Sequence, residues 1–318
     1  DRAVVLCDLN VFEELGVKVP DSNWTYEDFV ETVEALTQKK NSKSYTGVYL
    51  PYHQAFVWMQ FVRGFGGEWF DEDNLDLVLT QGKSFEGLSS MFMLLNRGYA
   101  QANGFDAKNS LNAKCGMSFA FASQPDRNGM YFLSEEELMR NPANYAEELA
   151  KDNNLLILPL PKFPEGDVGA SNTDFIHGFA MVDSSKKKNL AAKLIGFSQS
   201  VEGQKILNKY YGGIPSNVDA QKEDFWKVGV FASQANAENA LMGIEHDRRD
   251  DFFEALHDSK DLFEENIRLR AMFSRVLFRD LERLNNKGTK DRVGDAVVDA
   301  LKQLERQSSI TIKLAERR

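Results

Sequence analysis

Short apolar runs that alternate with amphipathic helical stretches constrain this chain more than any other feature. The runs have the length and composition of buried strands, and between them apolar residues recur every three or four positions, which is typical of helices. From about residue 220 the pattern becomes almost wholly helical. Strands separated by helices, followed by a helical part, predict an α/β architecture. The strand-like runs are residues 3–7, 45–50, 115–122, 155–158 and 175–182.

Local signals mark where several elements begin and end. Thr25–Asp28 has the composition of a capping box, which starts a helix. Gly16 stands where a glycine commonly ends one. Ser84 is expected to cap the helix that follows it. The end of the chain, residues 310–314, alternates with period two and is predicted to be a strand.

Length and charge limit the function classes. A chain of 318 residues suggests about two domains. Its formal net charge is −10, and an acidic surface repels phosphate backbones, which disfavours nucleic acid as a partner. The sequence contains no apolar stretch of about 20 residues that would span a membrane. No signal peptide or lipid-attachment motif is visible, and because residue 1 stands within a predicted strand, we expect further residues upstream.

The two cysteines, Cys7 and Cys115, both stand in apolar runs. Two cysteines make neither a disulfide framework nor a metal site by spacing. We therefore expect two buried thiols that pack as small hydrophobic side chains.

No catalytic motif is recognisable. Nucleophile elbows, phosphate loops and dinucleotide fingerprints have no counterpart in the sequence. Glu68, with Asp71 and Asp73, could supply acid and base groups, and glycosidases need two carboxylates at a set separation. An enzyme therefore stays an alternative, but the expectation is a protein without catalysis, metal or cofactor. The histidines lack metal-ligand spacing, and two of them stand in charged, solvated stretches; they are His53, His177, His246 and His257.

A series of short motifs occurs in a fixed order along the chain. They are residues 7–17, 24–29, 64–71, 113–117, 158–161, 178–182, 191–197, 200–204 and 213–216. The series resembles the family of bacterial extracellular solute-binding proteins of ABC importers that includes maltose-binding protein, over about residues 3–304. Cys7-Asp8 stands where the family has tyrosine-asparagine, and Trp24 precedes Thr25 in reversed order, which indicates a distant member.

The resemblance implies a type II periplasmic-binding-protein-like fold, with two α/β lobes, a cleft between them and a helical C-terminal part. It also implies that the opening part of the N-terminal lobe lies outside this sequence. One hypothesis is that the chain is circularly rearranged, with its last strand paired to residues 179–182. The implied division is 1–172 for the core of the C-terminal lobe, 173–212 for a segment of the N-terminal lobe, 213–306 for the helical completion of the C-terminal lobe, and 307–318 for an extra terminal strand.

The candidate ligand-binding residues follow from this resemblance and from the chemistry of sugar sites, which combine aromatic faces with polar groups. Residues at strand ends are included because ligand sites of α/β proteins collect there. For the aromatic residues the alternative is packing in the core. For His177 the alternative is a structural role at the hinge, with no ligand contact. Trp24 is expected in the core, whereas Trp226 is expected either to stack on the solute or to lie on the surface. The candidates are Tyr52, His53, Phe56, Trp58, Phe119, Ser123, Asp174, His177 and Arg275.

The function implied is that of a receptor outside the membrane, either periplasmic or a cell-surface lipoprotein. It would bind a sugar or oligosaccharide, close around it and deliver it to an ABC permease, contacting the membrane only through a lipid anchor outside this chain. One alternative is a cytoplasmic ligand-sensing domain of a winged-helix transcriptional regulator. Another is a glycoside-active enzyme.

Overall fold

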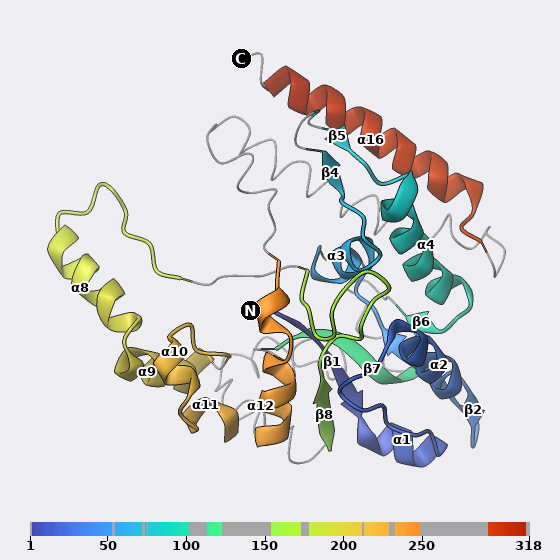
Figure 1. Ribbon diagram of the computed structural model, residues 1–318, viewed down its shortest axis with the longest axis horizontal. Coiled ribbons are helices and arrows are strands. Elements are labelled where there is room, and N and C mark those ends of the chain that lie inside the picture. The colour runs from blue at the N-terminus through green and yellow to red at the C-terminus, as the bar shows by residue number, and fades with distance from the viewer. Residues whose placement is uncertain are drawn as a thin grey trace.

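The computed structural model describes residues 2–52, 55–71, 74, 76–101, 113–122, 154–172, 178–211, 213–228, 233–248 and 292–315. A mixed sheet lies near the middle of the molecule, with helices on both sides and one helical arm projecting away from it (Figure 1). The strands are β1 (Ala3–Asp8), β2 (Lys39–Lys40), β3 (Lys43–Tyr49), β4 (Phe70–Asp71), β5 (Asp76–Leu77), β6 (Ala100–Gln101), β7 (Ala113–Phe121) and β8 (Leu155–Leu158). The α-helices are α1 (Leu9–Leu15), α2 (Tyr26–Leu36), α3 (Ala55–Gly64), α4 (Gly82–Asn96), α8 (Lys188–Ser198), α9 (Val201–Tyr211), α10 (Val218–Gln221), α11 (Phe225–Val228), α12 (Gln234–Leu241) and α16 (Asp295–Ala315), and η1 (Ile244–His246) is a 3₁₀-helix.

The order of the strands brings several carboxyl ends to one edge of the sheet. The order is β2-β3-β7-β1-β8, and β6 pairs with β3. β3 runs parallel to β7, whereas β1 runs antiparallel to both β7 and β8. Consequently β3, β7 and β8 all end at the edge where β1 begins.

Helix boundaries mostly follow the signals in the sequence. Thr25 and Asp28 form the predicted capping box at the start of α2, with both reciprocal hydrogen bonds present. Gly16 ends α1 with φ +71°, as predicted. The prediction for Ser84 is wrong, because α4 begins two residues earlier and the Ser84 hydroxyl donates to the backbone oxygen of Glu68 instead.

Alternating side chains of the sheet feed two hydrophobic clusters. Val5 and Cys7 point into the larger one, with α1 to α4 and α16. Val4 and Leu6 point into the smaller one on the opposite face, under α11 and α12. Trp226 is fully buried in this second cluster, so the expectation of surface exposure is wrong, and stacking on a solute stays a prediction.

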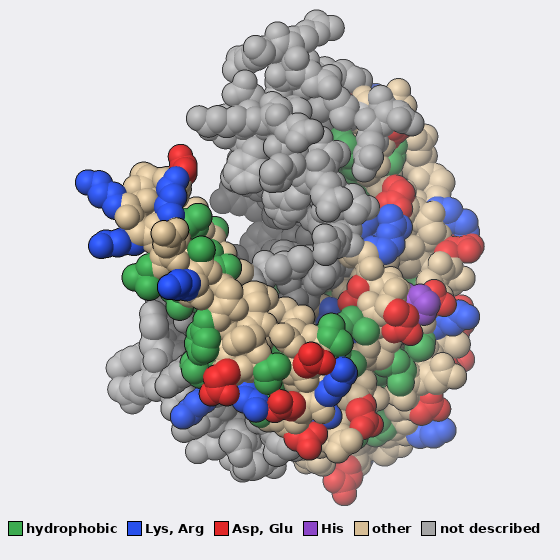
Figure 2. Space-filling view, turned by 60° about the vertical axis from the view of Figure 1, so that its left-hand side comes forward, with side chains coloured by type: hydrophobic (Ala, Val, Ile, Leu, Met, Phe, Trp, Pro, Cys, Tyr) green, Lys and Arg blue, Asp and Glu red, His purple; other side chains and the backbone are tan. Residues whose placement is uncertain are grey.

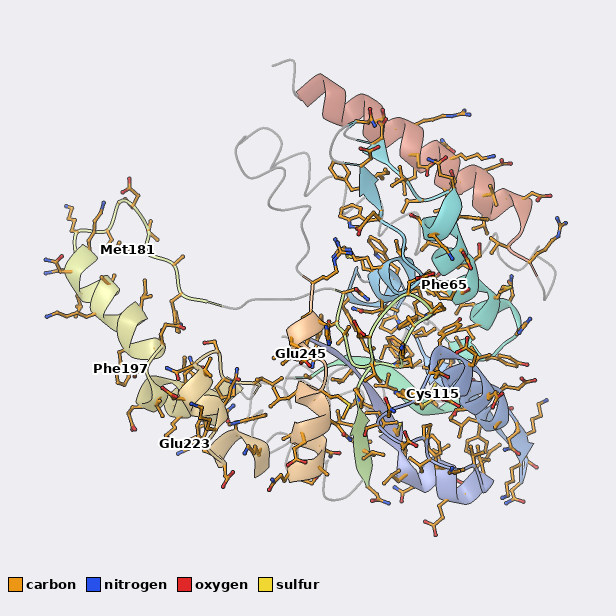
Figure 3. The ribbon with its side chains drawn as sticks, viewed as in Figure 1. Phe65, Cys115, Met181, Phe197, Glu223 and Glu245 are labelled. Carbon is orange, nitrogen blue, oxygen red and sulfur yellow. The ribbon has the colours of Figure 1, made fainter. Side chains whose placement is uncertain are left out.

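A projecting arm carries α8 and α9 to the left of the sheet (Figure 1). The described part of the predicted strand 175–182, residues 178–182, is not a strand. A strand needs neighbours to satisfy its backbone and cover its faces, and among the described residues none lies beside this segment. Instead the arm exposes a row of large apolar side chains, visible among its lysines in Figure 2 and, for Met181 and Phe197, in Figure 3. They are Phe179, Met181, Val182, Leu190, Leu194, Phe197 and Ile206.

The predicted terminal strand at 307–318 is wrong, because α16 continues as a helix to Ala315. The helix is anchored by Val297, Leu301 and Leu304, which are buried, and each added residue of a formed helix gains a hydrogen bond. The alternation at 310–314 is too short to outweigh that extension. The pairing with residues 179–182, on which the circular rearrangement depended, is therefore not formed.

Candidate functional site

Three polar backbone segments meet at the sheet edge where β3, β7 and β8 end. The first is the start of β1 at residues 2–3, the second is residues 171–172 and the third is residues 247–248. The Ser171 hydroxyl accepts from the Ala3 N–H at 3.2 Å, and the Arg248 N–H donates to the Ser171 oxygen at 2.9 Å. We call this meeting point the junction.

Arg2 is the central cation of the junction. Its side chain is only 3% exposed, and its Nη2 lies 2.6 Å from the Asp247 carboxylate. Nη1 donates to the backbone oxygens of Ala240 and Met242, each at 2.9 Å, and Nη2 also donates to that of Gly169. A buried guanidinium needs this many acceptors because its charge loses the solvation of water.

Asp247 is the carboxylate that joins the three segments. Besides Arg2, its Oδ1 accepts from the Ser171 N–H at 2.8 Å, so one oxygen binds the start of β1 and the second segment together. The side chain is 12% exposed. In water-poor surroundings such charge-assisted bonds are stronger than neutral ones.

Two polar side chains of α3 hold the second segment from the other side. The Asn172 N–H donates to Gln60 Oε1 at 2.7 Å, and Arg63 Nη1 donates to the Asn172 oxygen at 2.9 Å. Arg63 Nε lies 3.2 Å from Glu68, whose other oxygen accepts from Arg248 Nη1 at 2.7 Å. The junction is thus a continuous polar network at one end of an otherwise apolar body.

The predicted aromatic site residues are core residues in this structure. Tyr52, Phe56, Trp58 and Phe119 are between 0% and 4% exposed and belong to the larger cluster. Phe56 packs near the edge, because its ring centroid is 4.1 Å from that of Phe121 at the end of β7. This is the core alternative left open by the sequence, and contact of these four residues with a solute stays a prediction.

The remaining candidates lie outside the described residues. Three of them stand close in sequence to described residues: His53 follows Tyr52, Ser123 follows Ala122, and Asp174 stands two residues after Asn172. Ala122 is tied to this edge because its N–H donates to the Arg2 oxygen at 2.8 Å. Two of these neighbours, Ala122 and Asn172, belong to the junction or contact it, and nothing described adjoins Arg275.

Two of the three carboxylates considered for catalysis have other partners in the structure. Glu68 contacts two arginines, and Asp71 accepts from the backbone and side-chain nitrogens of Asn74. Asp73 lies outside the described residues. His246, about half exposed, lies 3.6 Å from Asp167, and within the described ranges no three potential metal ligands gather into one group.

The cysteines are free thiols, as expected. Cys7 is buried and Cys115 partly buried. Burial raises the pKa of Cys115 from 9.0 to about 12, and burial followed by the charge of Asp8 raises that of Cys7 further. Because the thiolate is the reactive form, neither side chain is a nucleophile near neutral pH.

Comparison with known protein families identifies the fold and the class of protein. The family of bacterial extracellular solute-binding proteins matches residues 8–238. The chain belongs to this family. No match is found among curated proteins.

Solved structures of other solute-binding proteins share the fold at low sequence identity. UgpB from Mycobacterium tuberculosis in complex with glycerophosphocholine has a TM-score of 0.65 and 14% identity, over 98% of this chain and 69% of that one. The sugar-binding protein MalE from Xanthomonas citri gives 0.63 and 14%, over 99% and 69%. The ABC substrate-binding protein Lmo0181 from Listeria monocytogenes in complex with cycloalternan gives 0.60 and 16%, over 98% and 70%. The expected type II periplasmic-binding-protein fold is thereby confirmed.

Sequence reasoning missed most of the junction in this solute-binding protein. Asp247 follows His246 in a charged stretch that the sequence predicts to be solvated, and nothing in its neighbours reveals that it is largely buried. Gln60 and Arg63 did leave a signal, since they are polar residues three positions apart in the otherwise apolar helix 55–65. Such a pair on a buried helix needs partners.

In the described part of the chain, no helix combines the length and the apolar character needed to cross a membrane.

Proposed function

We propose that this solute-binding protein holds a sugar or oligosaccharide beside the junction and delivers it to an ABC importer. The observation that carries the proposal is the convergence of three strand ends and two further chain segments at one polar sheet edge. Ligands of α/β proteins bind beyond the carboxyl ends of the strands, where loops from several strands meet. The junction offers this arrangement on a rigid base.

The choice of a sugar is supported by the ligands of proteins with the same fold. Complexes with cycloalternan, α-D-tagatose and maltotriose are among them. Glycerophosphocholine, bound by UgpB, shows that the fold also accepts a phosphodiester. The net charge of −10 favours a neutral solute over an anionic one.

The residues proposed to contact the solute are those predicted from the sequence. The described members are Tyr52, Phe56, Trp58 and Phe119, and the set is completed by His53, Ser123, Asp174, His177 and Arg275. Because the four aromatic side chains are buried here, they can contact a solute only if the sheet edge first opens. The solute would then bind to this opened form, and the two lobes would close over it.

The setting proposed is outside the membrane, in the periplasm or at the cell surface through a lipid anchor. The division into residues 1–172, 173–212 and 213–306 remains our proposal for the parts of the two lobes. Delivery to the permease requires no chemistry on the solute, so the sugar should be released unchanged.

A thermal-shift screen of the protein against monosaccharides, oligosaccharides, amino acids and glycerophosphodiesters tests the proposal. A ligand that binds only the folded state stabilises it by about 2.7 kcal/mol at a hundredfold excess over its Kd. We expect a shift from one class of sugar, with the sugar recovered intact by chromatography. A shift from amino acids or phosphodiesters alone would contradict the sugar assignment, and hydrolysis of the sugar would contradict a binding role.

A further inference from the structure

Glu68 connects two arginines that come from distant parts of the chain. Its Oε2 lies 3.2 Å from Nε of Arg63, on α3, and its Oε1 lies 2.7 Å from Nη1 of Arg248. The Glu68 carboxylate thus contacts two guanidinium groups, one through each oxygen. A carboxylate shared in this way has both oxygens occupied by charged donors.

Each of these arginines also holds the backbone of the second junction segment. Arg63 donates to the Asn172 oxygen, and the Arg248 N–H donates to the Ser171 oxygen. The contacts therefore close a ring that runs from Asn172 through Arg63, Glu68 and Arg248 back to Ser171. Breaking the ring at Glu68 would leave residues 171–172 and 248 joined by fewer contacts.

The backbone of Glu68 is fixed by the turn before it. Gly66 has φ +80°, and Gly67 packs so closely that an added Cβ would stand 2.5 Å from the Ser84 nitrogen. The Ser84 hydroxyl donates to the Glu68 oxygen. The carboxylate is thus presented from a rigid support, which favours a defined contact over a fluctuating surface pair.

Two of the three ion pairs around the junction differ sharply in burial. Arg2 and Asp247 are 3% and 12% exposed, whereas Glu68 and Arg248 are 48% and 45% exposed. Water and salt screen an exposed pair but hardly reach a buried one. The buried pair of Arg2 and Asp247 therefore stays formed in the folded protein, whereas the exposed pair of Glu68 and Arg248 can open without unfolding the body.

We propose that Glu68 is a releasable tie that fastens Arg248 to residues 171–172 and so acts as a positioning residue for these two described segments of the junction. Its effect on a ligand rests on the proposed function, because residues 173–177 follow directly on Asn172 and include two candidate solute contacts. The tie itself is a property of the protein without ligand.

Hydrogen exchange measured by mass spectrometry on the whole protein tests the tie. The variants are Glu68→Gln, Arg248→Gln and the double variant, with Glu165→Gln as the matched control. Glu165 is 54% exposed, lies against Gly66 and pairs with Lys83 at 3.7 Å, outside the ring. Urea unfolding of every variant shows whether any change is confined to the junction.

We expect each single variant to raise exchange of the Arg248 and Asn172 amides about two- to fivefold, as suits a half-exposed pair. The double variant should exchange no faster than Glu68→Gln alone, because that substitution already removes the bond to Arg248. High salt should speed exchange at these amides in the wild type but not in Glu68→Gln. A readout of global packing would not show this salt signature.

Unchanged exchange in Glu68→Gln, an equal rise throughout the protein, or the same rise in Glu165→Gln would overturn the tie. Binding of the monosaccharides and oligosaccharides of the thermal-shift screen, measured by calorimetry on the same samples, separates the two proposals. If the exchange result holds and no sugar binds even the wild type, the proposed function fails and the tie stands. If the wild type binds sugar and exchange is unchanged, the tie fails and the function stands.

Discussion

Replacing Asp247 by alanine should lower the free energy of unfolding by about 4 kcal/mol. The substitution leaves the Arg2 guanidinium, 3% exposed, without its counter-charge. Removing one partner of a buried ion pair costs about 3–5 kcal/mol, and the backbone oxygens that still surround Arg2 place this site at about 3 kcal/mol. The Ser171 N–H also loses its acceptor, which adds about 1 kcal/mol.

Urea unfolding followed by tryptophan fluorescence measures this loss, because all four tryptophans are buried in the body of the protein: Trp24, Trp58, Trp69 and Trp226. Asp183→Ala is the control, since Asp183 pairs with Lys188 at 2.7 Å, almost the distance of the Arg2 pair, but is fully exposed. We expect it to cost less than about 1 kcal/mol. Asp247→Asn keeps an acceptor for Ser171 and should fall between the two. Equal losses in Asp247→Ala and Asp183→Ala would refute the argument that burial sets the energy.

Three further predictions concern backbone, thiols and a helix start. Gly243→Ala should lower the free energy of unfolding in urea at least twice as much as Gly16→Ala. Both glycines have φ above +70°, but of the two only Gly243 would place the added Cβ against an oxygen, that of Val168 at 2.3 Å. Equal losses would exclude the steric cost. Cys7 and Cys115 should resist a thiol reagent at pH 8 until urea unfolds the protein, and rapid labelling of the native protein would contradict this. Their raised pKa values should make stability fall as pH rises above about 9. Thr25→Ala should lower the free energy of unfolding by about 1 kcal/mol. It should also raise the pKa of Asp28, which the hydrogen bonds from Thr25 now lower, and an NMR titration without that rise would disprove the coupling.

Patterns that act over a few residues allowed much of the fold to be predicted. The capping box at Thr25, the terminating Gly16 and the apolar run at residues 155–158 each specify structure locally, and each is confirmed. The terminal helix shows where this fails. Residues 310–314 alternate like a strand, but the buried stripe that starts at Val297 decides their conformation from outside the segment.

The site was less predictable because its residues come together only in the folded chain. Asp247 and Arg2 are separated by almost the whole sequence, and a charged residue carries no mark of its burial. The burial of Trp226 was also not predictable, because it depends on packing against the sheet face that carries Val4 and Leu6. By contrast, Gln60 and Arg63 broke an apolar helical pattern, so their need for partners could be read from the sequence.

The apolar row on the projecting arm has a consequence for the cooperativity of unfolding. In α8 only Ser198 is buried, while Leu190 and Leu194 are 65% and 58% exposed, so little apolar surface returns to water when this helix melts. Its local opening free energy should therefore be far below that of the sheet, which places the two in separate cooperative units. Helix content should begin to fall at lower urea than tryptophan fluorescence, and a single two-state fit should not describe both signals.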